Sequence, residues 1–160
     1  MEDKEKNLEK AKETFKSLCA MLDEDEWSYD KDEDDLVIRF TARGEDIPMD
    51  FIVIIDPHPG LIRLLSYMPF QVGQERMIDT AIAICAINFI LKNGTFEFDI
   101  NSGMIGFRMT QAFFDSSLGS DIFKYLVYIS AHTVDEYNDK LLMISKGNLP
   151  LNDFLKELAE

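Results

Sequence analysis

The stretch RMIDTAIAICAINFILKNG, residues 76–94, is almost free of polar side chains: between Thr80 and Leu91 only Asn88 is clearly polar. This apolar run has about a dozen residues, well short of the ~20 that a membrane-spanning helix needs. It ends in Lys-Asn-Gly, a sequence typical of a helix terminus. We therefore expect a helix over residues 74–92 that packs against protein, which is either the core of its own chain or a second chain.

This predicted helix has apolar residues on two opposite sides of a helical wheel. One side carries Ile78, Ile82, Cys85, Ala86 and Phe89, the opposite side carries Thr80, Ile84, Ile87 and Leu91, and a narrow strip of Ala81, Asn88 and Lys92 is left for water. A helix on a sheet needs one apolar face, and burial of each large aliphatic side chain contributes about 1.5–3 kcal/mol. We expect the second face to be covered by the long C-terminal helix or by the same helix of a second copy.

Hydrophobic periodicity elsewhere predicts helices and strands in a mixed order. Helical spacing predicts a helix over 4–22, a long helix over 121–146 that stops at Gly147, and a short helix over 149–158. Alternating or short apolar runs bounded by turns predict strands at 27–29, 36–43, 51–55, 61–68, 95–100 and 104–110. The order α-β-β-β-β-α-β-β-α-α indicates one α+β domain over residues 1–160, an antiparallel sheet of five to six strands with helices packed on it.

Composition restricts the classes of partner. The chain of 160 residues has 16 Lys and Arg against 30 Asp and Glu, a formal net charge of −14. Affinity for nucleic acid and for anionic membranes comes largely from basic residues, so neither is expected as a partner. The start MEDKEKNLEKAKETF lacks the apolar segment of a signal peptide, which favours a cytoplasmic protein. Cys19 and Cys85 both lie in helical patterns, so we expect buried free thiols, with a disulfide as the alternative.

The acidic stretch DEDEWSYDKDEDD, residues 23–35, suggests a calcium site at first sight. Asp30, Asp32 and Asp34 have the spacing of the first three ligands in an EF-hand loop. The pattern then fails, because Asp35 stands where the loop needs glycine and Thr41 where it needs glutamate. We expect a solvated acidic turn.

The remaining candidates for chemistry are two histidines and one glycine-containing turn. His58 lies in the turn DPHPG, and His132 precedes Asp135 and Glu136 on the long helix, where ion pairing at the surface is expected. The NSGMIG sequence lies in a predicted hairpin rather than at the start of a helix, so it is not a phosphate site. We therefore predict no metal site, no cofactor and no enzymatic activity.

One face of the predicted sheet is a candidate binding surface. Its polar residues are Arg39, Thr41, Glu97, Asp99 and Arg108, and the aliphatic residues Ile52 and Ile54 interrupt them. An apolar strip with charges at its rim is typical of a sheet face that binds an extended peptide or a protein. The alternative is that the last helix, or the strand after DPHPG, covers the strip. The candidate protein-binding residues are therefore Ile52 and Ile54 on the sheet, and Ile84, Ile87 and Leu91 on the apolar helix.

Two segments resemble a known family. The hairpin FEFDINSGMIGFRM, residues 96–109, and the helix end LLMISKGNLP, residues 141–150, resemble the bacterial YbjN-type domain, whose members have been proposed to be sensory transduction regulators. The fold of that family is similar to that of type III secretion chaperones. The shared motifs are an aromatic strand, a turn with glycine and a glycine after a helix, so no catalytic residue is carried over.

The resemblance implies a non-enzymatic, homodimeric protein-binding domain. Chaperones of this fold hold an extended segment of a client protein on their surface. Two alternatives stay open: a signalling regulator that acts through a folded partner, and a small-ligand or metal-binding protein. The family resemblance covers the element order of nearly the whole chain.

Overall fold

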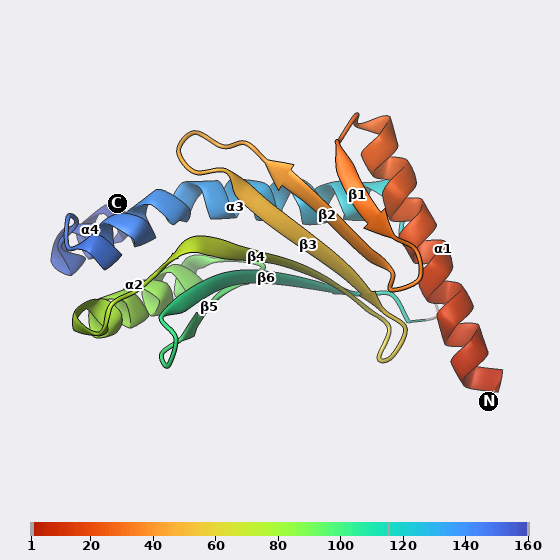
Figure 1. The fold of residues 1–160 in the computed structure, drawn as a ribbon, viewed down its shortest axis with the longest axis horizontal. Helices are drawn as coiled ribbons and strands as arrows, with labels where there is room; N and C mark the ends of the chain where they lie inside the picture. The colour runs from red at the N-terminus through yellow and green to blue at the C-terminus, as the bar shows by residue number, and fades with distance from the viewer. Residues whose placement is uncertain (1, 115, 160) are drawn as a thin grey trace.

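Six segments pair into a single antiparallel sheet in the computed structural model, which describes residues 2–114 and 116–159 (Figure 1). The order of the strands across the sheet is β1-β2-β3-β4-β6-β5, and every neighbouring pair is antiparallel. The strands are β1 (Tyr29–Asp32), β2 (Val37–Ala42), β3 (Met49–Asp56), β4 (Leu61–Gln71), β5 (Thr95–Asp99) and β6 (Met104–Ala112). The predicted α+β class with an antiparallel sheet is confirmed.

The helices follow the predicted order. They are α1 (Glu2–Glu24), the single 3₁₀ turn η1 (Gln74–Arg76), α2 (Met77–Ile90), α3 (Ser120–Lys146) and α4 (Leu151–Ala159). Gly147 ends α3 with a left-handed φ of 73°, a conformation that glycine adopts without steric cost. The first strand begins two residues later than predicted, because the N–H of Trp27 still bonds to the carbonyl of Leu22 in the last turn of α1.

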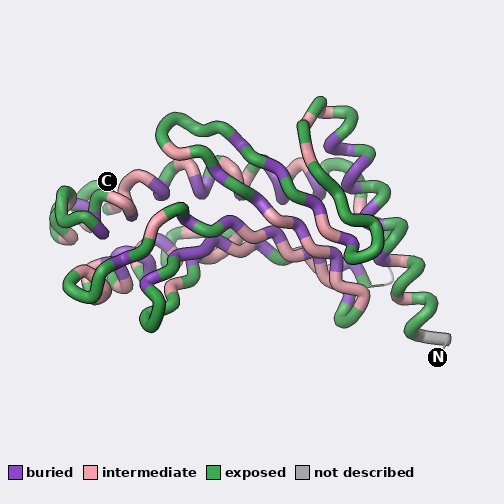
Figure 2. Tube along the Cα trace, in the orientation of Figure 1, coloured by how far each residue is buried: buried purple, intermediate pink, exposed green. Residues whose placement is uncertain are grey.

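Alternation along the strands buries one face of the sheet beneath α1 and α3. Helix α3 contacts β3, β4 and β6, and α1 contacts β3. Figure 2 shows buried residues alternating with less buried ones along the central strands. The core side of the sheet includes Ile38, Phe40, Phe51, Val53, Leu64, Ile105 and Phe107. Such a period of two is what a sheet with one covered face requires.

The other face, which we call the open sheet face, points away from α1 and α3. Its side chains lie in rows across the strands, and one such row places Ile52 between Arg39 on β2 and Leu65 on β4. The strand after DPHPG pairs beside β3 rather than over it, and α4 packs against α2. The two elements expected as possible covers, α4 and β4, therefore do not lie over Ile52 and Ile54.

Helix α2 lies along the outer edge of β5 and satisfies the hydrogen-bonding groups of that strand. The amide of Asn88 donates from Nδ2 to the carbonyl of Phe96 at 2.9 Å and accepts from its N–H through Oδ1 at 2.8 Å. Asn88 thus takes the place of a further strand, which protects a sheet edge. The prediction that Asn88 faces water is wrong.

The two apolar faces of α2 have very different surroundings. Thr80, Ala83, Ile84 and Ile87 are buried, and α2 contacts α3, α4 and β5. The side chains of Ile84 and Ile87 are 5% and 0% exposed, so neither is available to a partner of the folded chain. The opposite face is uncovered: Ile78 is 76% exposed and Phe89 is 91% exposed. Of the two covers expected for the face with Ile84 and Ile87, the structure has the long helix of the same chain, together with α4 and β5.

The hairpin that follows also departs from its prediction at one residue. Ile100 was expected to face the core with Phe96, but it is exposed. The strand ends at Asp99, whose carboxylate accepts hydrogen bonds from the N–H of Asn101 at 2.9 Å and the hydroxyl of Ser102 at 2.7 Å. These bonds turn the chain at Ile100, so the alternation stops one residue early.

Candidate functional site

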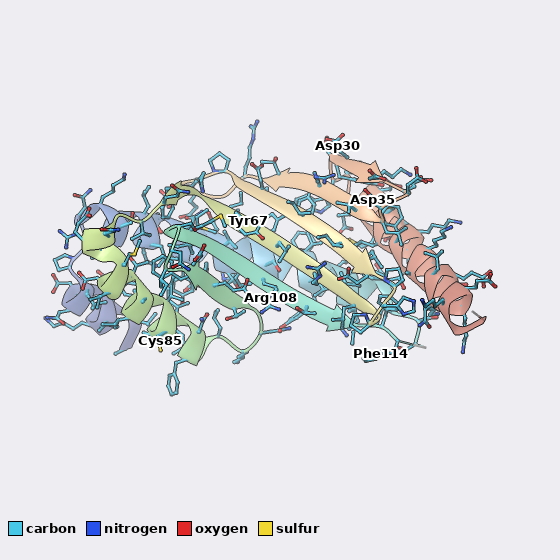
Figure 3. All side chains as sticks on the ribbon, turned by 60° about the horizontal axis from the view of Figure 1, so that its bottom comes forward. Asp30, Asp35, Tyr67, Cys85, Arg108 and Phe114 are labelled. Atoms are coloured by element: carbon cyan, nitrogen blue, oxygen red, sulfur yellow. The ribbon has the colours of Figure 1, made fainter. Side chains whose placement is uncertain are left out.

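The centre of the open sheet face is aliphatic. Ile52 on β3 lies opposite Leu65 on β4, and Leu65 lies opposite Arg108 on β6. Ile54, one step further along β3, is half-buried like Ile52. Figure 3 shows this face toward the viewer, with Tyr67 and Arg108 on it and α3 behind the sheet. The predicted sheet residues therefore lie together on one surface.

Charges on this face are arranged in pairs around the aliphatic centre. Arg63 binds the carboxylate of Asp56 with two nitrogens, one of them at 3.1 Å. Arg108 donates from Nε to Glu97 at 2.7 Å. Arg39 forms no ion pair with any residue of the described ranges. The face therefore offers an aliphatic centre and, at Arg39 and the nearby Arg43, two guanidinium groups without an ion pair in residues 2–114 and 116–159, on a chain whose net charge is −14.

A hollow of about 750 Å³ lies beside this aliphatic centre, over β1, β2 and β3. Arg39, Thr41, Asp50 and Ile52 are among the residues that line it. The hydroxyl of Thr41 donates to Asp50 at 2.6 Å. Arg39 forms no ion pair within the described residues, although Asp30 lies opposite it and also lines the hollow, so its guanidinium is available to a carboxylate or carbonyl from outside. The hollow has the size of a ligand site and is partly open to solvent, which suits a peptide segment better than an enclosed small molecule.

The second uncovered surface is on α2. We call it the α2 stripe: Ile78, Ile82, Cys85 and Phe89, all exposed. Their spacing of four, three and four residues places them in a line along one side of the helix. Leu91, also predicted as a binding residue, is half-buried, and its N–H closes the last turn at the carbonyl of Ile87. The stripe is uncharged along its whole length.

The cysteines differ from the prediction that both are buried. Cys19 is buried and free, and burial raises the pKa of its thiol. Cys85 is free but exposed. No disulfide joins them.

We expect a thiol reagent such as Ellman's reagent to react with one cysteine of the native protein and with two after denaturation. The exposed thiol of Cys85 reacts at once, whereas Cys19 is protected by packing and by its raised pKa. The Cys85→Ser variant is the control, and it should show no fast-reacting thiol. Two fast thiols in the native protein would contradict the burial of Cys19.

The acidic turn is organised by its own backbone. The carboxylate of Asp32 accepts hydrogen bonds from the N–H groups of Asp34 and Asp35 at 3.1 and 3.0 Å. Lys31 pairs with Glu33 at 2.7 Å. Within residues 2–114 and 116–159, no three His, Cys, Asp or Glu side chains are placed to hold a metal ion together.

The two histidines lie on separate elements. His58 is exposed in the β3–β4 turn, and its Nδ1 is 3.3 Å from the side-chain amide of Asn7 on α1. His132 is exposed on α3, with Nε2 3.9 Å from the carboxylate of Glu136. Each histidine therefore contacts a neighbouring surface residue, and the two imidazoles do not form a common site.

None of the helices in the described part of the chain combines the length and the apolar character needed to cross a lipid bilayer. Helix α2 spans 14 residues, with one side in the core and the other at the surface. This agrees with the length argument made from the sequence.

Taken together, the fold is an α+β domain in which one face of a six-stranded antiparallel sheet is covered by helices and a further helix lies along the β5 edge. A solved structure of YbjN from E. coli, described as a proposed transcription regulator, has a similar fold. The two chains superpose with a TM-score of 0.59 at 14% sequence identity, covering 78% of this chain and 91% of YbjN. That likeness establishes the fold alone.

Comparison of the sequence with known families and curated proteins does not assign the chain to a family. No family model matches the chain, and no curated protein is detectably similar to it in sequence. The YbjN-like fold indicated by the hairpin and helix-end motifs is thus supported by three-dimensional similarity.

Proposed function

We propose that the protein is a non-enzymatic, chaperone-like protein-binding domain that works as a homodimer and holds a segment of a partner on the open sheet face. The observation that carries this proposal is the pair of uncovered apolar surfaces, the open sheet face and the α2 stripe, on an otherwise acidic chain. Exposed apolar surfaces bordered by polar residues mark interaction sites. The description of YbjN as a regulator suits a role in binding other macromolecules.

The open sheet face has the features of a surface for an extended segment. The Ile52–Leu65 pair supplies aliphatic contact area across two adjacent strands, and Arg39 and Arg108 flank that pair in a row that continues to Asp30 on β1 and Thr95 on β5. Arginine is favoured at protein interfaces because its guanidinium binds carbonyl and carboxylate oxygens while its stem packs on apolar side chains. A partner segment that alternates aliphatic and acidic or polar side chains fits this arrangement.

A second candidate is a signalling regulator that acts through a folded partner. The description of the structurally similar YbjN as a regulator favours it. The two candidates differ in what is bound. A chaperone-like domain binds an isolated short segment of its partner, whereas a regulator needs the partner's folded surface.

The test is site-specific photocrosslinking in cells, followed by measurement with the purified partner. A photoreactive amino acid at Leu65 should give one defined adduct, and the same amino acid at the exposed His132 on α3 should not. Calorimetry with that partner should then show binding to the wild type that is weakened roughly tenfold or more by Ile52→Asp. The matched control is Ile122→Asp, an exposed position on α3.

Several outcomes would decide against this function. Unchanged affinity of the Ile52→Asp variant would show that the sheet face is not the binding surface. Binding of the folded partner but of none of its isolated segments would favour the regulator. Turnover of a small molecule that stops on Ile52→Asp would replace a binding function by an enzymatic one.

A further inference from the structure

We propose that a hollow between α1 and the β1–β2 hairpin binds a small organic anion that has one carboxylate and a short apolar body. We call this site the hairpin hollow, and its volume is about 490 Å³. It lies on the helix-covered side of the sheet, because Lys31 in its lining is opposite the buried Ile38 of β2. The site is therefore separate from the open sheet face, and the inference goes beyond the function proposed for that face.

Helix α1 forms one wall of the hairpin hollow and the β1–β2 hairpin, which lies beside it, forms the other (Figure 1). The hydroxyl of Tyr29 on β1 donates to the carboxylate of Asp23 at 2.9 Å, which joins the two walls near the end of α1. Phe15, Cys19 and Leu36 line the hollow but are themselves buried, so its floor is the edge of the hydrophobic core. The volume lies within the range of about 300–1,000 Å³ that is usual for small-molecule sites.

Two amines that we call the rim amines, those of Lys12 and Lys16, lie one turn apart on α1 and line the hollow. Both side chains are exposed, and neither forms an ion pair within residues 2–114 and 116–159. Glu13, which lies between them in the sequence, pairs with Lys10 at 3.3 Å. Like charges four residues apart on a helix repel each other. A carboxylate that reaches both amines therefore removes this repulsion and accepts two charge-assisted hydrogen bonds.

The other charges in the lining determine how many negative charges the ligand carries. Lys31 pairs with Glu33 at 2.7 Å, so these two side chains neutralise each other. Asp23 lies at the far end of the hollow, about 10 Å beyond Lys16 along the helix axis. Asp34 then remains to offset the two rim amines. One positive charge is left at the rim of the hollow, on a chain whose net charge is −14, and it matches a ligand with a single carboxylate.

The order of the side chains along α1 determines the direction of the ligand. The rim amines come first, Cys19 and Ala20 follow, and Asp23 comes last. The carboxylate therefore binds at the rim amines, and the apolar body lies toward Cys19 and Ala20, where the lysine stems add methylene groups. A second carboxylate at the far end of the ligand would meet Asp23. The hollow should therefore discriminate against dicarboxylates as well as against neutral and cationic analogues.

The first experiment is a titration of the isotope-labelled full chain with hexanoate, followed by two-dimensional NMR. We expect saturable shifts of the backbone amides in residues 12–20 and 31–36. Hexanol, hexylamine and the dicarboxylate adipate should each bind weaker by roughly tenfold or more, because none of them offers a single carboxylate to the rim amines. Equal binding of hexanol would show that apolar contact alone holds the probe, and shifts confined to the α2 stripe would place it elsewhere; either result would overturn the proposal.

The second experiment removes the rim amines. The double variant Lys12→Gln, Lys16→Gln should bind hexanoate weaker by roughly tenfold or more, because both charge-assisted hydrogen bonds are lost. Both positions are exposed, so the variant should stay folded by circular dichroism. The matched control removes two other lysines, Lys10→Gln and Lys156→Gln, and should bind hexanoate like the wild type. The Lys10 amine donates to Ser117 at 2.8 Å, and Lys156 lies on α4.

A third variant fills the hollow without changing its charge. Ala20 is exposed on α1, and leucine is a good helix former, so Ala20→Leu should fold normally. We expect it to weaken hexanoate binding, because the larger side chain occupies the space assigned to the apolar body. Hexanoate binding as tight as in the wild type would show that the apolar body does not lie beside Ala20, and the proposed direction would be wrong.

Three further results would overturn the inference as a whole: no saturable shift with millimolar hexanoate, unchanged binding by the variant without rim amines, or binding of inorganic phosphate as tight as that of hexanoate. None of these depends on the sheet face. Ile52→Asp, which should weaken binding of the partner segment, should leave hexanoate binding intact. A protein that binds the partner segment but not hexanoate would remove the hairpin hollow as a site and keep the proposed function, and the opposite result would do the reverse.

Discussion

The Ile87→Asp variant is expected to be unfolded under conditions in which the wild type is fully folded. Ile87 is 0% exposed, on the side of α2 that faces the core. An unpaired carboxylate in such a place carries a desolvation cost of several kcal/mol, and the lost burial of isoleucine adds about 1.5–3 kcal/mol. A typical protein has only about 5–15 kcal/mol of stability in total. Circular dichroism and urea denaturation measure the effect.

The matched control is Ile78→Asp, nine residues or about two and a half turns away, on the outer side of the same helix. Its side chain is 76% exposed, so the Ile78→Asp variant should keep the thermal midpoint of the wild type. A folded Ile87→Asp protein with a normal denaturation curve would show that the faces of α2 have been assigned the wrong way round.

The Asn88→Leu variant is expected to lose about 2 kcal/mol of stability although leucine has nearly the size of asparagine. The Asn88 amide satisfies both the N–H and the C=O of Phe96 at the outer edge of β5. Leucine leaves both backbone groups without a partner in a half-buried place, and each such group costs about 1–3 kcal/mol when water cannot replace the bond. For a protein of this size the change corresponds to a fall in the melting temperature of about 4–8 °C.

Hydrogen exchange tests this prediction at a single backbone amide, that of Phe96. The amide of Phe96 should be protected in the wild type and exchange much faster in Asn88→Leu, ahead of global unfolding. Asn152→Leu, at an exposed position on α4, is the control and should change neither the melting temperature nor the exchange of Phe96. Equal protection in both variants would mean that Asn88 contributes nothing to the edge of the sheet.

Much of the fold was predictable because its determinants are local. Alternation in 36–43 and 104–110, a stop at Gly147 and a proline at the start of the last helix each act within a few residues. The rejection of an EF-hand also rested on local spacing, and the turn is held by Asp32 and its own backbone. Short turns between strands then favoured antiparallel pairing.

The open sheet face was predictable for the same reason, though only as a set of residues. Alternation placed Ile52 and Ile54 on one side of β3 together with Arg39 of β2. It carried no information on whether a helix covers that side. The packing of α4 against α2 depends on contacts between segments more than sixty residues apart, which no local pattern records.

Helix α2 shows which of its features local sequence determines and which depend on tertiary contacts. Periodicity determines which residues share a side of the helix. The sequence therefore correctly grouped Ile78 with Phe89 on one side and Ile84 with Ile87 on the other. It does not determine how the helix is rotated about its axis, because both sides are apolar and either could face the core. The rotation is set by tertiary contacts: α3, α4 and β5 bury Ile84 and Ile87, and the amide of Asn88 binds the edge of β5. Burial and backbone hydrogen bonding together turn Phe89 outward, where the sequence pattern had no preference.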